Sequence, residues 1–268
     1  MKNLLFIGAG SMAEALLRGW VAQRVVEPAH VFVTNRSNEA RLTYIEETYN
    51  VQRFSGLETL RTIDVIVLAM KPKDAHACFS TIKPYLSEHT AVLSVLAGIG
   101  IDTIEQHLGT RPIARVMPNT SATLGMSASG IAFNDAVTAK QQHYFLTLLQ
   151  AVGKVVEVAE DQLHAVTALS GSGPAYIYYM MEAFLNAGEQ LGVEKDTVRA
   201  LMVQTLAGSA AMLDAFDEEP ATLRKQVTSP GGTTEAGIGV LDTHHVKEAL
   251  EACVIRAAER SRELAAGK

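Results

Sequence analysis

The chain has 268 residues, 48% of them hydrophobic, which gives room for one large domain or two modest ones. Its formal net charge is −6 with acidic and basic residues interspersed, which argues against the basic surface that a nucleic-acid partner requires. Its two cysteines argue against a disulfide framework or a cysteine-rich metal site and suit a reducing cytoplasm.

The first half of the chain alternates short β-branched or apolar runs with longer stretches of helical period. Such alternation predicts βαβ units and a parallel sheet. The helix expected at residues 38–49 begins at Asn38, whose side chain can cap the free amides of its first turn. Further strands at 130–133 and 155–158 flank a helix at 138–151 and extend the sheet at one edge. The main strands are expected at residues 4–7, 31–34, 65–69, 92–96 and 113–117.

The second half has a different texture, because β-branched runs disappear after Asp161 and Ala, Leu, Met and Glu dominate. The sequence therefore predicts an α/β protein in which a Rossmann-type doubly wound sheet, residues 1–160, precedes an all-helical domain, residues 161–268. Helices in the second domain are expected at residues 174–191, 195–216, 220–227, 235–241 and 245–264.

The first expected strand ends in the pattern Gly-x-Gly-x-x-Ala, and a helix follows directly. Gly8 permits the tight turn, Gly10 lets the backbone approach a pyrophosphate, and Ala13 lets the helix pack on the sheet. The helix start, which includes Ser11 and Met12, offers free amides and positive potential to phosphates. The pattern predicts a dinucleotide site, although bare matches to it also occur in ordinary loops.

The end of the second strand discriminates between the two nicotinamide cofactors. A carboxylate there would bind the ribose hydroxyls of NADH, but this chain has Asn35, Arg36 and Ser37. Arg36 can pair with a 2′-phosphate, and its two neighbours can hydrogen-bond it. NADPH is therefore the expected cofactor and NADH a weaker one; a solvated arginine is the alternative interpretation.

Other residues that follow expected strands belong to the same edge, where doubly wound sheets bind ligands. Four of them are expected along the cofactor, namely Ala69, Met70, Lys71 and Ala97. Asn119 is expected at the nicotinamide or the substrate. The alternatives are a solvated loop lysine for Lys71 and a turn former after proline for Asn119.

Two segments of the helical half, residues 169–176 and 229–237, are dense in small residues. In the second segment, glycines break the preceding helix, so the amides of Gly232, Thr233 and Thr234 are expected to point outward at the next helix start. Together they predict an anion site of the size of a carboxylate. A plain turn between helices is the alternative.

At these residues the sequence resembles the pyrroline-5-carboxylate reductase family. The resemblance implies reduction of the cyclic imine 1-pyrroline-5-carboxylate to L-proline by NADPH, the last step of proline biosynthesis. It also implies a helical domain that interlocks with a second subunit as a homodimer, and assembly of such dimers to a decamer. The residues that carry it are Gly8 to Ala13, 70–72, 117–120, 169–176, and above all 229–234 with Gly237, Leu241 and Asp242.

The resemblance also implies roles for residues of the second domain. The substrate carboxylate would lie on Ser229 and the amides near Gly232, Thr233 and Thr234, with the Thr234 hydroxyl as the catalytic contact to the ring nitrogen. A cyclic iminium is already electrophilic, so orientation is expected to contribute more than a strong acid. Some relatives carry Val or Thr in place of Met70, where the expected contact is through backbone.

Two other functions stay open at this point. A β-hydroxyacid dehydrogenase would share the Gly-x-Gly-x-x fingerprint after the first strand and the helical domain. Such an enzyme would use a lysine on the helix after the sheet, and residues 161–194 contain no lysine. A non-catalytic regulator on the same fold is the second, and the intact 229–234 loop argues against it.

Export, membrane insertion and metal binding are not expected. The apolar run before Gly8 is too short for a secretory signal, and Gly171, Gly173 and Pro174 interrupt the long uncharged stretch at residues 165–181. His244 and His245 are adjacent, which is not the spacing of a zinc site. A soluble cytoplasmic protein is therefore expected.

Overall fold

The computed structural model describes residues 2–267 and divides them into two compact units. The first unit comprises residues 2–172 together with 257–267, and the second comprises residues 173–256. The sequence predicted a domain boundary near residue 160. In the structure, residues 161–172 and the last turns of the final helix group with the sheet instead.

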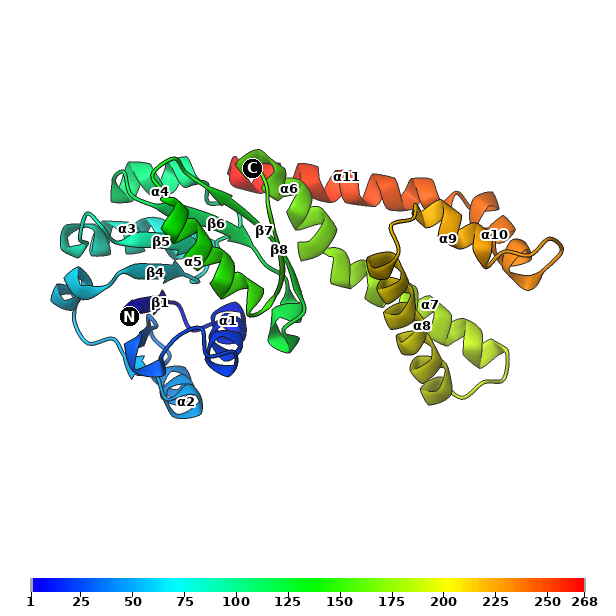
Figure 1. Ribbon diagram of the computed structural model, residues 1–268, viewed down its shortest axis with the longest axis horizontal. Helices are drawn as coiled ribbons and strands as arrows, with labels where there is room; N and C mark the ends of the chain where they lie inside the picture. Colours follow the sequence, from blue (N-terminus) through cyan, green and yellow to red (C-terminus); the bar gives the residue numbers. More distant parts are fainter. Residues whose placement is uncertain (1, 268) are drawn as a thin grey trace. The chain divides into compact units, whose positions relative to one another are not determined.

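The first unit is built on one eight-stranded sheet, counted over residues 2–267, in the order β3-β2-β1-β4-β5-β6-β7-β8 (Figure 1). Neighbouring strands are parallel except β6 and β7, which are antiparallel. The order reverses at β1, which gives the switch point of a doubly wound fold between β1 and β4. The strands are β1 (Leu4–Ile7), β2 (Val31–Thr34), β3 (Gln52–Arg53), β4 (Val65–Leu68), β5 (Ala91–Ser94), β6 (Ile113–Met117), β7 (Ser127–Phe133) and β8 (Gly153–Glu157).

Helices cover both faces of this sheet. Side chains of β1 alternate between the faces: Leu4 and Phe6 join one buried cluster, and Leu5 joins the other. Because both faces are covered, the central strands are continuous apolar runs, which is why the sequence revealed them. One face is covered by α1 (Ser11–Ala22), α2 (Glu39–Tyr49) and α5 (Ala139–Gln150), the other by α3 (Ala75–Ile82) and α4 (Ile101–Leu108).

Local capping sets several helix starts. Asn38 accepts a hydrogen bond from the Arg41 amide at 2.9 Å, as the sequence predicted for α2. Thr138 and Gln141 form a reciprocal capping box at the start of α5. Short 3₁₀ segments link the larger elements: η1 (Pro28–His30), η2 (Leu57–Thr62), η3 (Pro72–Asp74), η4 (Lys83–Tyr85), η5 (Thr120–Leu124) and η6 (Glu160–Gln162).

The small-residue segment at 169–176 is helical rather than a loop. After α6 (Leu163–Val166), η7 (Thr167–Gly171) is a π-helical turn, in which the Ser172 amide donates to the Thr167 carbonyl at 2.8 Å. This segment packs on the sheet at Gly171, where an added Cβ would lie 2.9 Å from Met117 of β6. That close approach explains why residues up to Ser172 belong to the first unit.

The second unit is helical, as predicted. Its helices α7 and α8 pack at Gly188, where an added Cβ would lie 2.3 Å from Val198. Among the described residues 173–256, Gly188 and Val198 are the two that are buried. Across the described chain, no helix combines the length and hydropathy needed to cross a bilayer. The helices are α7 (Gly173–Gln190), α8 (Lys195–Ala215), α9 (Pro220–Gln226), α10 (Thr233–Thr243) and α11 (Val246–Ala265), whose residues from 257 onward belong to the first unit.

Candidate functional site

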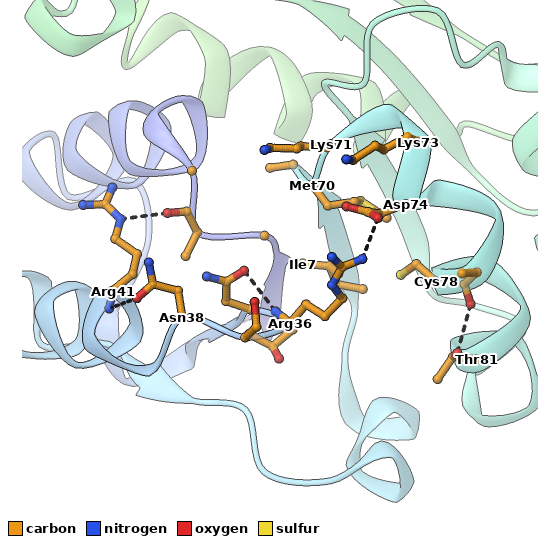
Figure 2. A pocket seen from close by; sticks show the side chains of 18 of the residues that line it. Ile7, Arg36, Asn38, Arg41, Met70, Lys71, Lys73, Asp74, Cys78 and Thr81 are labelled. Carbon is orange, nitrogen blue, oxygen red and sulfur yellow. Dashed lines mark hydrogen bonds and ion pairs between the residues drawn. The ribbon is translucent and has the colours of Figure 1, made fainter. Parts of the chain in front are cut away.

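A cleft of about 840 Å³ opens at the carboxyl ends of β1, β2 and β4, the edge at which doubly wound sheets bind ligands (Figure 2). It brings together most of the residues predicted to hold the cofactor. Met12, Ala13 and Ala97 are not among the described residues that line it. The predicted residues that do are Gly8, Gly10, Ser11, Asn35, Arg36, Ser37, Ala69, Met70 and Lys71.

The turn after β1 has the geometry that the fingerprint predicted. Gly8 has a positive φ of 107°, and an added Cβ would lie 2.6 Å from the backbone of Ala69 and Met70, so only glycine fits. An added Cβ on Gly10 would meet no heavy atom of the described residues within 4 Å, which leaves open space beside this backbone. Ala13 is buried at 4% exposure, where α1 packs on the sheet. The turn therefore fits a dinucleotide pyrophosphate.

The end of β2 carries an acidic neighbour that the sequence analysis missed. Arg36 points toward Asp74 of η3, and its Nη1 pairs with the Asp74 Oδ1 at 2.7 Å (Figure 2). The Arg36 side chain is 76% exposed, and only one of its five N–H donors is needed for this contact. Arg36 therefore keeps donors for a phosphate, but a carboxylate competes for it.

Asp74 was missed because it follows β4, whereas Arg36 follows β2. Asp74 lies shortly after Lys71, which was already expected at the ligand-binding edge of the sheet. That position is the sequence signal that could have revealed Asp74. Lys71 and Lys73 also line the cleft, so cations outnumber Asp74 at this end.

Three more lining residues were not anticipated. Glu14 of α1 and Arg41 of α2 form an ion pair at the wall of the cleft, with side chains 23% and 26% exposed. Cys78 of α3 lines the cleft as well, and burial raises the pKa of its thiol to about 11. At neutral pH that thiol is protonated and a poor nucleophile.

Asn119 belongs to the first unit and has a structural task there. It is buried at 8% exposure; its Oδ1 accepts from the Ser121 amide at 3.1 Å, and its Nδ2 donates to the Ser170 carbonyl at 3.0 Å. The side chain thus starts η5, as a turn former does, and ties it to the π-helical turn. A contact to substrate from Asn119 stays a prediction.

The 229–234 loop lies in the second unit and starts α10 at Thr233. Gly231 has a positive φ of 72°, and its amide donates to the Glu235 carboxylate at 2.7 Å. The Gly232 amide donates to the Ser229 carbonyl at 3.0 Å, so it does not point outward as expected. Of the three amides predicted to bind an anion, the Gly232 amide is used in this tight turn. The amides of Thr233 and Thr234 are the two that remain.

The residues expected to hold the substrate are thus divided: Asn119 lies in the first unit, and Ser229 to Thr234 lie in the second. Within residues 2–267, no group of three or more His, Cys, Asp or Glu side chains is placed to hold a metal ion.

Comparisons with known proteins find relatives that match nearly the whole chain. Residues 160–264 match the family described as pyrroline-5-carboxylate reductase dimerisation, and residues 3–98 match the family described as NADP oxidoreductase, coenzyme F420-dependent. The chain is 43% identical to pyrroline-5-carboxylate reductase 2 of Bacillus subtilis (strain 168), over 98% of this chain and 95% of that one.

Two solved structures are similar throughout. A pyrroline-5-carboxylate reductase from Coxiella burnetii has a TM-score of 0.90 and 38% identity, with 98% of each chain covered. The Plasmodium falciparum pyrroline carboxylate reductase with NADP bound has a TM-score of 0.88 and 29% identity, also with 98% of each chain covered. The fold predicted from the sequence is confirmed, and the chain belongs to the pyrroline-5-carboxylate reductase family.

Proposed function

We propose that the chain reduces 1-pyrroline-5-carboxylate to L-proline and oxidises NADPH to NADP⁺. The whole-chain similarity to pyrroline-5-carboxylate reductases is the observation that carries this proposal, and the cleft lined by Gly8, Gly10 and Arg36 supports it. In the reaction, hydride adds to the imine carbon while the ring nitrogen holds a proton, and the product is the saturated ring.

NADPH bound in the cleft of the first unit would supply the hydride. The turn at Gly8 and Gly10 and the start of α1, with Ser11, Met12 and Ala13, hold its pyrophosphate. Asn35, Arg36 and Ser37 hold the 2′-phosphate. The residues toward the nicotinamide are Ala69, Met70, Lys71 and Ala97.

The substrate carboxylate binds the 229–234 loop. Ser229 supplies a hydroxyl, Thr233 and Thr234 supply amides at the positive end of α10, and Gly232 keeps the turn tight. The Thr234 hydroxyl is the hydrogen-bond partner of the ring nitrogen, and Asn119 is a further contact of the substrate. Orientation of the iminium toward the hydride is the main source of rate, so no strong acid is required.

The active enzyme is a homodimer formed through the helical unit. The family matched by residues 160–264 is described by its dimerisation, and the exposed apolar side chains of this unit need a cover. Assembly of dimers to a decamer is a further prediction, which sedimentation can resolve. A cytoplasmic location is also predicted, and the free thiols of Cys78 and Cys253 suit it.

The decisive experiment measures NADPH oxidation by the purified chain with 1-pyrroline-5-carboxylate, and identifies the product. Consumption of NADPH that requires this substrate and yields L-proline in equal amount is expected. Absence of turnover would favour a non-catalytic role. Oxidation of a β-hydroxyacid with NADP⁺ in its place would favour the dehydrogenase alternative.

The loop itself is tested by Thr234→Ala, which is expected to lower kcat/KM for 1-pyrroline-5-carboxylate by about 1 to 3 kcal/mol while NADPH affinity stays unchanged. Gly232→Val should be worse, because an added Cβ would lie 2.5 Å from the Ser229 hydroxyl. Thr243→Ala, at the opposite end of α10, is the matched control. Weaker NADPH binding with unchanged substrate kinetics would remove the loop from the substrate site.

A further inference from the structure

A part-buried ion pair between α1 and α2 has no role in the function described so far. Glu14 lies in the first turn of α1, and Arg41 lies near the start of α2. The Arg41 Nη2 donates to the Glu14 Oε2, and the hydroxyls of Tyr44 and Tyr49 donate to the other carboxylate oxygen at 3.1 and 3.0 Å. The Arg41 guanidinium is therefore fixed in direction.

The same guanidinium also holds the backbone of the fingerprint turn. The Arg41 Nε donates to the Ala9 carbonyl at 2.8 Å, between Gly8 and Gly10 (Figure 2). In a planar trans peptide the carbonyl and the next N–H point in opposite directions, so this bond also sets the direction of the Gly10 amide. This peptide joins Ala9 to Gly10, and the glycine, which has no Cβ, would otherwise leave it freer to rotate.

The Glu14 carboxylate would oppose an anionic ligand if it stood alone, because it lies one turn from the start of α1. Burial would raise the pKa of Glu14, but hydrogen bonds from Arg41 and Tyr49 outweigh burial and lower that pKa. The carboxylate stays charged and keeps Arg41 paired. Arg41 in turn cancels the negative charge at the wall of the cleft.

We propose that Arg41, held by Glu14, is a positioning residue that directs the Gly8 to Gly10 turn toward the dinucleotide pyrophosphate. The inference rests on the proposed cofactor site. The pyrophosphate is common to NADPH and NADH, so Arg41 acts on both cofactors equally. Arg36, in contrast, acts on NADPH alone, because the 2′-phosphate is absent from NADH.

A purely structural role makes a different prediction. If Arg41 only joined α1 to α2, its loss would lower the melting temperature and leave cofactor affinity intact below that temperature. A positioning role changes the dissociation constants of both cofactors by the same factor. It leaves the KM for 1-pyrroline-5-carboxylate unchanged, because that site lies on other residues.

The test is equilibrium titration of the full chain with NADPH and with NADH, followed by nucleotide fluorescence. Arg41→Gln is expected to raise both dissociation constants by about tenfold, the size of one lost charge-assisted hydrogen bond. Arg41→Lys keeps the charge but loses the planar fork, so a rise of about threefold is expected for both. If Arg41→Gln fails to fold, Arg41→Lys carries the test.

Arg53→Gln is the matched control. Arg53 pairs with Glu39 and Glu46 at 2.7 Å, also against α2, but none of the three lines the cleft among the described residues. Both dissociation constants should stay at the wild-type value in this variant. Equal losses in Arg53→Gln and Arg41→Gln would overturn the proposal.

Two further outcomes also overturn it: unchanged affinities in both Arg41 variants, or a loss confined to NADPH, which would place Arg41 at the 2′-phosphate. Because binding is measured without turnover, the result is separable from the proposed reaction. A chain that binds both nucleotides through Arg41 but does not reduce 1-pyrroline-5-carboxylate would retain this inference and lose the proposed function.

Discussion

The two units of the chain differ most in what they bury. The first unit packs its apolar side chains into two clusters, one on each face of the sheet, and Phe145 and Trp20 in it are 0% exposed. In the second unit, Tyr179 is 74% exposed and Leu191 is 82% exposed. Both sequences are apolar, so composition alone does not create a core.

A helical sequence pattern therefore does not by itself produce a buried core. Isolated helices gain most of their stability from tertiary packing, and within the described residues 173–256 that packing is centred on Gly188 and Val198. We therefore expect the first unit to be stabilised by its own contacts and the second by another copy of the chain. Removal of one aromatic ring from each unit tests this contrast, and three further predictions concern the cleft of the first unit.

The first prediction concerns the core of the first unit. Phe145→Ala is expected to lower its free energy of unfolding by about 3 to 5 kcal/mol, because it removes a fully buried aromatic ring and leaves a cavity. Trp20 is the single tryptophan and lies in this unit, so urea unfolding followed by its fluorescence measures the loss. Leu124→Ala, at a 79% exposed side chain, is the control and should change the free energy by less than about 0.5 kcal/mol.

The second prediction concerns the cofactor site. Arg36→Gln is expected to lower kcat/KM for NADPH by about 1.5 to 3 kcal/mol and to leave kcat/KM for NADH unchanged, because only NADPH carries the 2′-phosphate. Steady-state kinetics with both cofactors give the comparison. Equal losses with the two cofactors would assign Arg36 to another part of the nucleotide.

The third prediction applies the first substitution to the second unit. Phe184→Ala removes a ring that is 45% exposed in α7, and it is expected to raise the dimer dissociation constant by about tenfold. Sedimentation at several protein concentrations measures this, while the Trp20 transition should stay in place. An unchanged dimer would mean that Phe184 faces solvent in the assembly.

The fourth prediction concerns the carboxylate that pairs with Arg36. Asp74→Asn is expected to raise the ratio of kcat/KM for NADPH to that for NADH by about threefold, since a competitor of the 2′-phosphate is removed. Glu46→Gln, which removes a carboxylate from an ion pair outside the cleft, controls for net charge. A fall in the ratio would instead show that Asp74 orients Arg36 for the phosphate.

The fifth prediction concerns Cys78, tested in a Cys253→Ser variant so that it is the single thiol. Burial raises its pKa to about 11, so the reactive thiolate is scarce at neutral pH and increases as pH rises toward that value. The alkylation rate should therefore increase about tenfold per pH unit and level off only near that pKa. Levelling near about pH 8.5, the ordinary thiol value, would contradict it.

Sequence reasoning succeeded where the signal is local. Gly8 was placed at a tight turn after the first strand, and its positive φ and close contact with Ala69 and Met70 agree, because such a position needs a residue without a Cβ. It succeeded less well at the 229–234 loop, where it predicted three outward amides. The turn closes on the Gly232 amide, and that detail depends on backbone torsions that composition does not specify.

The two-residue strand β3 was missed because its exposed residues, Gln52 and Arg53, lack the apolar run of a buried strand. Asp74 and the Glu14 and Arg41 pair were missed for another reason. Their partners are 38 and 27 residues away in sequence, and the pairs exist only once strand order and helix packing are known.

The sequence determined the alternation of strands and helices, the tight turn after β1 and the family, because periodicity, glycine geometry and motif spacing are properties of short segments. Tertiary structure alone decided which charges meet in the cleft and where the first unit ends. It also showed that large apolar side chains of the second unit, such as Tyr179 and Leu191, are not buried within that unit. These features depend on contacts between residues far apart in the sequence. Such contacts are set by the spatial order of the strands and by the packing of the helices on the sheet.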